Sequence, residues 1–211
     1  LAATITAHQT FVDLLLDVLL AFGMVIALTD ELWRTAERRA AELAAAHAAL
    51  QETALRDPLT GVPNRRAFDE GWGLEPVRGA GRGAVVVLDL DNLKQVNDAH
   101  GHAAGDALLR HAARVLRDAL DGGAALYRWG GDEFLVVAPE EGADAAAARL
   151  SDAVHRCGDV AGPWPTGAVR VRASVGGAAF AGGDDPRAAV LAALAAADEA
   201  MYRDKARRKT G

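Results

Sequence analysis

The chain has 211 residues, half of them hydrophobic, so it can hold one good-sized domain and an extension. Its formal net charge of −6 disfavours nonspecific binding to nucleic acid, and no nucleic-acid partner is expected, but a local basic pocket for phosphates stays possible. Cys157 is the only cysteine, which excludes an intrachain disulfide and fits a reducing cytoplasm. Because the chain begins with leucine, we expect a fragment or processed product, with an upstream sensor domain outside it.

Residues 1–29 form an apolar segment that carries only Asp13 and Asp17 as formal charges. Residues 11–28 are long enough for a short membrane span, and the arginines that follow suit a cytoplasmic flank, which would anchor the protein in the inner membrane. The two aspartates disfavour that hypothesis, because acids inside a membrane are costly. The alternative is a helix packed tightly against its copy at a dimer interface, and the sequence leaves both open.

Residues 30–56 are rich in Ala, Glu, Arg and Leu and contain neither Gly nor Pro, which favours a helix. Ala36, Leu43 and Leu50 lie seven residues apart, an imperfect heptad pattern that is compatible with a parallel two-helix coiled coil. The pattern predicts a signalling helix through which the chain forms a homodimer, and the alternative is a single exposed helix. Pro58 should end the helix, since proline disfavours helical conformation in the residue before it.

Residues 57–211 alternate between helix and strand patterns. Helices are predicted near 63–72, 92–99, 103–120, 142–157 and 186–206, and strands near 83–90, 124–129, 133–139 and 168–180. A loop or short hairpin is predicted at 158–167, where two prolines lie. This order predicts an α/β sandwich with a mainly antiparallel central sheet.

The most informative motif is Gly-Gly-Asp-Glu at residues 130–133. It lies between two β-prone segments, so the glycine pair predicts a hairpin turn. Acids are poor strand formers, and Asp132 and Glu133 therefore suggest a use such as metal binding. Upstream, a hydrophobic strand ends in Asp89 and Asp91, which share one face. If the two strands pair, Asp89 meets Asp132 or Glu133, and such clustered carboxylates suit Mg²⁺.

Four motifs in order make the chain resemble the GGDEF-domain diguanylate cyclases, bacterial enzymes that join two GTP into cyclic di-GMP. They lie in 57–68, 89–106, 130–134 and, as two short pieces, 174–176 and 197–202. The resemblance implies a ferredoxin-like, palm-type nucleotidyl cyclase domain preceded by a long N-terminal helix or coiled coil. It also implies a cytoplasmic catalytic domain that serves as the output of a dimeric signalling protein.

The resemblance implies a metal site with two Mg²⁺ or Mn²⁺ per active half-site, held by Asp89, Asp132, Glu133 and the backbone carbonyl of Leu90. The 3′-hydroxyl of one GTP attacks the α-phosphate of the other, and such transfer depends on metal ions and orientation. Asp132 is the candidate base, with Glu133 assisting. Lys94 is expected to neutralise phosphate charge, and a plain surface lysine is its alternative.

The resemblance also implies a substrate site. Asn97 and Asp106 should read guanine, because a carboxylate can accept hydrogen bonds from guanine N1 and N2, whereas adenine offers no such donor pair. The further substrate-binding positions are His102, Gly130, Gly131, Lys205 and Lys209. An ordinary turn histidine is the alternative for His102, and a helix cap is the alternative for Asp91.

The chain departs from the family pattern at several positions. Arg208 and Lys209 replace a glycine and an arginine, so attraction for phosphate survives but bidentate geometry does not. Asn92 and the leucine after it replace an aromatic pair. Asp121 and Ala124 stand where the family's inhibitory product site has Arg and Asp, which predicts weak product inhibition.

Three other functions remain open from the sequence. They are a catalytically silent GTP-binding regulatory module, a purely structural dimerisation piece, and a cyclase that makes a mixed cyclic dinucleotide. The acids at 89, 132 and 133 argue against the first. Asp106 favours guanine at both sites and argues against the last.

Overall fold

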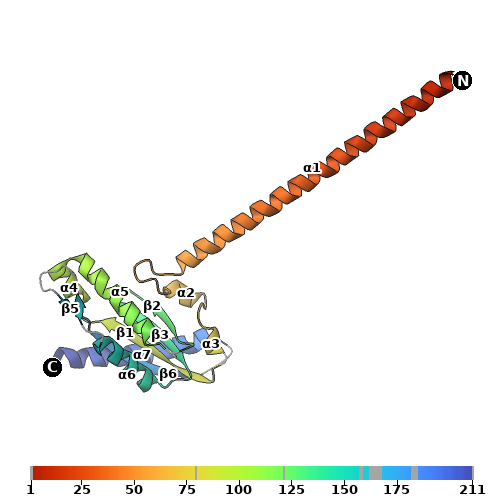
Figure 1. Cartoon of the computed structure of the whole chain (residues 1–211). Coiled ribbons are helices and arrows are strands. Elements are labelled where there is room, and N and C mark those ends of the chain that lie inside the picture. The colour runs from red at the N-terminus through yellow and green to blue at the C-terminus, as the bar shows by residue number, and fades with distance from the viewer. Residues whose placement is uncertain are drawn as a thin grey trace. The chain divides into compact units, whose positions relative to one another are not determined.

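The structure is a computed structural model, shown in Figure 1, and it divides into two units, Leu1–Glu52 and Thr53–Gly211. It describes residues 2–78, 80–120, 122–156, 159–161, 168–181 and 185–210. The first unit is a long helix, α1 (Ala2–Ala54), and the second holds a sheet with the remaining helices.

Helix α1 carries much exposed apolar surface. Within the single chain, the side chains of Phe22 and Trp33 are 66% and 72% exposed. The predicted long N-terminal helix is confirmed, and α1 runs without a break from Ala2 to Ala54, across the boundary between the predicted segments 1–29 and 30–56. Across the described residues, no helix has the length and apolar character that crossing a membrane demands.

The predicted antiparallel sheet is confirmed, and it contains four strands in the order β2-β3-β1-β6. Their bounds are β1 (Arg82–Leu90), β2 (Ala125–Arg128), β3 (Glu133–Pro139) and β6 (Ala173–Ala181). The register sets Asp89 of β1 opposite Glu133 of β3 on one side and opposite Ser174 of β6 on the other. Strand β1 thus brings separate sequence motifs to one end of the sheet.

Helices cover both faces of this sheet (Figure 1). One face carries α5 (His102–Asp118) and α6 (Ala143–Arg156), and the other carries α2 (Arg65–Asp69), α3 (Glu75–Arg78) and α7 (Pro186–Thr210). Side chains alternate across β1, so Val86 and Leu88 belong to the first core and Val85 and Val87 to the second. All four are at most 1% exposed, and burying each such side chain stabilises the fold by about 1.5–3 kcal/mol.

The predicted strand at 168–180 is two strands. Strand β5 (Ala168–Arg170) pairs with β4 (Asp159–Ala161), and β6 begins separately at Ala173. Of the loop or short hairpin predicted at 158–167, residue 158 and residues 162–167 lie outside the described residues.

The predicted helix at 63–72 is also shorter, because α2 ends at Asp69. Gly71 and Gly73 have positive φ angles of 77° and 82°. Glycine adopts this left-handed conformation without steric cost, and it ends a helix. Helix α4 (Leu93–His100) follows β1 directly, as predicted for this region.

Helix α7 meets β6 backbone to backbone at Gly176. A Cβ atom at this position would collide with the Met201 backbone nitrogen and the Ala197 carbonyl oxygen of α7. Main-chain atoms cannot rotate away as a side chain can. The glycine therefore fixes the distance between α7 and the sheet.

We expect Gly176→Ala to lower the free energy of unfolding by about 3 kcal/mol or more, because the helix must shift to admit the methyl group. Urea unfolding followed by circular dichroism measures the loss. Gly122→Ala is the matched control, since a Cβ at Gly122 meets no atom within 4 Å. Equal stability of both variants would contradict the proposed close packing.

Candidate active site

Carboxylates from β1 and β3 meet at one end of the sheet. The register sets Asp89 opposite Glu133, and directly opposed side chains on antiparallel strands have Cβ atoms about 4.5–5.5 Å apart. The Leu90 N–H donates to the carbonyl of Asp132 at 3.1 Å, which ties the hairpin turn to the end of β1. Asp89 is only 8% exposed. The structure therefore brings these predicted residues together, and we call Asp89, Asp132 and Glu133 the acidic group.

Lys205 of α7 reaches the acidic group. Its Nζ donates to Asp89 Oδ1 at 2.6 Å, and the two side chains are 27% and 11% exposed. Burial by itself would lower the pKa of Lys205, but the hydrogen bond to Asp89 and the charges of Asp89, Asp91 and Asp132 raise it overall. The lysine is therefore cationic and neutralises the most buried acid of the group.

The surroundings of Glu133 disfavour its negative charge. Burial raises the pKa of its carboxyl above the ordinary value, and the charges of Asp89, Asp132 and Asp198 raise it further. Lys205 acts in the opposite direction with a smaller effect. Crowded negative charge of this kind is relieved by a bound cation.

The acidic group fits a metal ion that protein and substrate hold together. No three His, Cys, Asp or Glu side chains among the described residues gather closely enough to hold a metal ion by themselves. Mg²⁺ is usually bound by one or two carboxylates plus substrate phosphates. Asp89, Asp132 and the Leu90 carbonyl can supply the protein part of such a site, with Glu133 beside them.

Arg128 at the end of β2 holds the glycine turn. Its Nη1 donates to the two carboxylate oxygens of Asp57 at 2.8 and 2.9 Å, and its Nη2 donates to the Gly131 carbonyl at 2.6 Å. Burial would raise the pKa of Asp57, but hydrogen bonds from Thr60 and Arg128 lower it overall. The backbone before Asp132 is thus fixed by a shielded ion pair whose side chains are 13% and 15% exposed.

The two glycines of the turn differ in their surroundings. A Cβ atom at Gly130 would come within 2.8 Å of Glu133 Oε2, so the first glycine makes room for that carboxylate. A Cβ atom at Gly131 would meet nothing within 4 Å, and Gly131 is exposed. The second glycine leaves the backbone of the turn open to a ligand.

Asn97 of α4 and Asp106 of α5 lie at the contact between their helices. Gly105 makes this contact possible, because a Cβ atom there would collide with Asn97 Oδ1. This oxygen is buried and has no hydrogen-bond partner among the described residues. The neighbouring Asp106 is 47% exposed and makes a 3.8 Å ion pair with Arg110. Two acceptors on either side of one glycine fit a ligand edge that offers donors.

Asp91 and Lys94 do not lie where the sequence predictions for them require. Asp91 accepts a hydrogen bond from Ser174 Oγ at 2.5 Å, and the N-cap of α4 is Asn92, so the cap hypothesis for Asp91 is wrong. Lys94, in the first turn of α4, is exposed and is not drawn into the acidic group.

His102 is exposed at the start of α5 and also lies outside the acidic group. The side chain of Lys209 and the whole of Asp121 lie outside the described residues. Their predicted roles therefore stay predictions.

Sequence reasoning gave no role to Arg128 or Gly105, although both lie in or beside the quoted motifs. Arg128 could have been suspected because only Trp129 separates it from the glycine turn. Gly105 could have been suspected because glycine disfavours the interior of a helix and needs a packing reason there.

Comparison with known proteins places this geometry in context. The sequence model of a family described as "Diguanylate cyclase, GGDEF domain" matches residues 54–210. Diguanylate cyclase DgcP of Pseudomonas aeruginosa is 36% identical over 161 residues, which are 74% of this chain and 23% of that protein. Cyclic di-GMP phosphodiesterase NbdA of the same organism is 45% identical over 96 residues, 44% of this chain and 12% of that protein. The chain thus spans about a quarter or less of these relatives.

Solved structures share the fold. The coiled coil and GGDEF domain of DgcB from Caulobacter crescentus, in complex with c-di-GMP, has a TM-score of 0.68 at 25% identity, covering 81% of this chain and 90% of that one. Diguanylate cyclase SiaD from Pseudomonas aeruginosa, in complex with its activator SiaC, has a TM-score of 0.62 at 29% identity, covering 97% and 78%.

Glu133→Gln should stabilise the metal-free chain at neutral pH. Because the pKa of Glu133 is raised on folding, the native state binds more protons than the unfolded state between the ordinary glutamate pKa and the raised value. Stability contributed by this residue therefore falls as the pH rises through that window. The gain is below about 1 kcal/mol, since solvent screens a partly exposed carboxylate.

Urea unfolding at pH 7 and at about pH 3.5, below the ordinary glutamate pKa, measures this effect. The gain should be present at pH 7 and absent at the lower pH. Glu199→Gln, an exposed change on α7, should give no gain at either pH. Destabilisation by Glu133→Gln at pH 7 would refute the crowded-charge interpretation.

Proposed function

The chain belongs to the family of GGDEF-domain diguanylate cyclases, and we propose that it condenses two GTP into cyclic di-GMP with release of two pyrophosphates. The observation that carries the proposal is the β1–β3 register, which joins Asp89, Glu133 and the Asp132 backbone at one end of the sheet. In an ordinary solvated turn, water would separate the acids, whereas here burial and neighbouring acids raise the pKa of Glu133.

The proposed reaction is attack of a GTP 3′-hydroxyl on the α-phosphate of a second GTP. Asp89, Asp132 and the Leu90 carbonyl would hold Mg²⁺ or Mn²⁺, two ions per half-site in this proposal, with Glu133 assisting. When bound, these ions neutralise phosphate charge and lower the pKa of the attacking hydroxyl. Asp132 accepts the proton of the 3′-hydroxyl, because it lies at the open turn where a second nucleotide can approach.

Cationic side chains orient the phosphates in this proposal. Lys205 already lies 2.6 Å from Asp89, so it can contact a phosphate bound at the same metal site. Lys94 at the start of α4 and Lys209 near the end of α7 contribute further positive charge. His102 and the open backbone of the glycine turn complete the substrate contacts.

Guanine selection rests on Asn97 and Asp106. The unpaired, buried Oδ1 of Asn97 can accept one of the donors on the guanine edge. Asp106 can leave its long ion pair with Arg110 and accept from N1 and N2. Adenine lacks this donor pair and would leave both acceptors unsatisfied.

A homodimer is part of the proposal, because each catalytic domain binds one GTP and two are joined. The exposed apolar surface of α1 supports pairing with the same helix of a second copy. A sensor domain outside this chain would change the register of the two helices. We place the catalytic domain in the cytoplasm, where GTP is available.

A catalytically silent regulatory module is the second candidate function. The similarity to NbdA, which is named a phosphodiesterase, favours it. Such a module would bind GTP through Asn97 and Asp106 and would make no product. Incubation of the chain with GTP and Mg²⁺, with products identified by mass, separates the two functions.

Asp132→Asn should reduce cyclic di-GMP formation by about 100-fold or more, because an amide is a poor base and a poor metal ligand. The measurement is initial rate by chromatography and mass, with folding checked by circular dichroism. Asp118→Asn, an exposed change at the end of α5, should keep the full rate. Near wild-type turnover of folded Asp132→Asn would remove Asp132 from the reaction.

Asp106→Ser should weaken GTP binding by about tenfold and reduce the preference for GTP over ATP, because a guanine edge loses its acceptor. Gly105→Ala should do the same by displacing Asn97. Competition binding of GTP and ATP measures both. Arg110→Gln removes only the ion-pair partner and should keep guanine preference. Unchanged preference in both test variants would assign guanine recognition elsewhere.

A further inference from the structure

Ser174 is a buried polar residue near the start of β6. It belongs to the short motif at 174–176, whose last residue, Gly176, makes the close contact with α7. Ser174 is 0% exposed, so its hydroxyl needs a hydrogen-bond partner inside the protein. The partner that it has indicates what the residue does.

The Ser174 hydroxyl lies beside two acids at the end of β1. The register sets Ser174 directly opposite Asp89, and Asp91 is the diagonal neighbour on the same face. Ser174 Oγ donates its only proton to Asp91 Oδ1 at 2.5 Å, whereas Asp89 accepts from Lys205 Nζ at 2.6 Å. Two acids on one strand face are thus held by two different donors.

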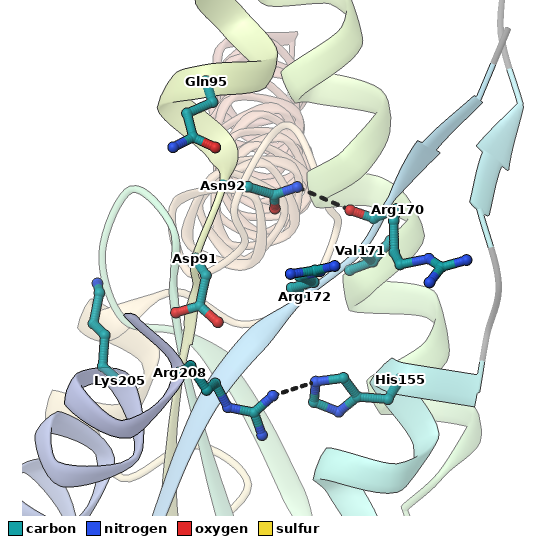
Figure 2. Close-up of a pocket in the computed structure, with 9 residues that line it drawn as sticks. All are labelled: Asp91, Asn92, Gln95, His155, Arg170, Val171, Arg172, Lys205 and Arg208. Atoms are coloured by element: carbon teal, nitrogen blue, oxygen red, sulfur yellow. Dashed lines mark hydrogen bonds between the residues drawn. The ribbon is translucent and has the colours of Figure 1, made fainter. Parts of the chain in front are cut away.

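The main chain after β1 is held on the same side. The Asp91 N–H donates to the Arg172 carbonyl at 3.1 Å. The side chain of Asn92 donates through Nδ2 to the Arg170 carbonyl at 2.9 Å, and Figure 2 shows this bond beside Asp91. The turn between β1 and α4 is therefore tied to the segment that precedes β6.

These bonds determine where the Leu90 carbonyl points. In a trans peptide unit the C=O and the next N–H point in opposite directions. Because the Asp91 N–H points to Arg172, the Leu90 carbonyl points away from β6, to the side of β3. The N–H of Leu90 also points to that side, where it donates to the Asp132 carbonyl. The carbonyl of Leu90 is thus directed towards the acidic group.

We propose that Ser174 is a positioning residue for the metal site. By holding the Asp91 side chain, it keeps the peptide unit between Leu90 and Asp91 in the orientation that directs the Leu90 carbonyl to the metal. It also keeps the Asp91 carboxylate from replacing Asp89 as the partner of Lys205 or as a metal ligand. This inference rests on the proposed function, in which Asp89, Asp132 and the Leu90 carbonyl hold the ion.

Metal affinity measured without turnover tests this role. The full chain is titrated with Mn²⁺, and free Mn²⁺ is followed by electron paramagnetic resonance. The sample contains a GTP analogue with a methylene group between its α- and β-phosphorus atoms, which cannot release pyrophosphate. Ser174→Ala should weaken Mn²⁺ binding about tenfold, because residues that orient metal ligands have effects of about 10- to 100-fold.

Ser151→Ala is the matched control, since it removes the hydroxyl of the chain's other serine, which lies on α6. It should change Mn²⁺ affinity less than about twofold. Thermal melting of each variant checks that it is folded. Wild-type Mn²⁺ affinity in Ser174→Ala, an equal loss in Ser151→Ala, or no Mn²⁺ binding by the wild-type chain would each overturn the proposal.

Variants of Asp91 test whether Ser174 acts through it. In an Asp91→Ala background, Ser174→Ala should cause no further loss of Mn²⁺ affinity, because the hydroxyl no longer has its partner. Asp91→Asn keeps an oxygen that accepts from Ser174, so it should lose less affinity than Asp91→Ala. Fully additive losses in the double variant would show that Ser174 acts by another route and would reject the mechanism.

Initial rates with GTP and Mg²⁺ separate this proposal from the cyclase activity. In Ser174→Ala, the Mg²⁺ concentration that gives half the maximal rate should rise about tenfold, whereas partial unfolding would only lower the maximal rate. Mn²⁺ binding that depends on Ser174 in a chain that makes no cyclic di-GMP would reject the activity and leave the positioning role. Cyclic di-GMP synthesis with an unchanged Mg²⁺ requirement in Ser174→Ala would do the reverse.

Discussion

The pairing of β1 with β3 is the constraint on which the candidate active site depends. It sets Asp89 opposite Glu133 and ties Leu90 to the carbonyl of Asp132. A slip of one residue would turn every side chain of a strand to the opposite face. Val86 and Leu88 pack in the core on one face and Val85 and Val87 in the core on the other, so a slip would exchange these side chains and disturb the close packing of both cores. The hydrophobic core therefore specifies the position of the acids.

The acids of the group differ in their electrostatic surroundings. Asp89 is nearly buried and is neutralised by Lys205, whereas Glu133 lies among like charges and has a raised pKa. Removing one partner of a shielded ion pair leaves an uncompensated charge, so Lys205 and Asp89 depend on each other. Arg128 and Asp57 form a second shielded pair, which holds the glycine turn from behind. The acidic group is thus supported by two cations from different elements.

Periodicity and turn chemistry predicted most of the fold. The hydrophobic run before Asp89 could only be a buried strand, and the glycine pair after β2 could only be a turn between strands. The split between β5 and β6 was not predictable, because Val171 and Ala173 continue the apolar pattern across the break. The short α2 was missed because φ angles at glycines are not encoded in hydrophobic spacing.

The candidate site was predictable in its carboxylates but less so in its cations. Asp89, Asp132 and Glu133 stand out because acids are unusual in and beside strands. Lys205 is 116 residues from Asp89 in the sequence, and no local pattern reveals that contact.

The backbone contact at Gly176 affects how the distance between α7 and the sheet responds to substitutions in the core. Where helix and strand are separated by side chains, changes in volume on one element shift the other by fractions of an ångström. Between α7 and β6 no such layer of side chains exists at this point, because Gly176 faces the main chain of α7 directly. Lys205 lies one helical turn after Met201, whose main chain makes this contact, so the reach of Lys205 to Asp89 depends on main-chain packing at this point. At Gly176, changes in the volume of side chains on either element therefore cannot alter the distance that separates the lysine-bearing helix from the sheet.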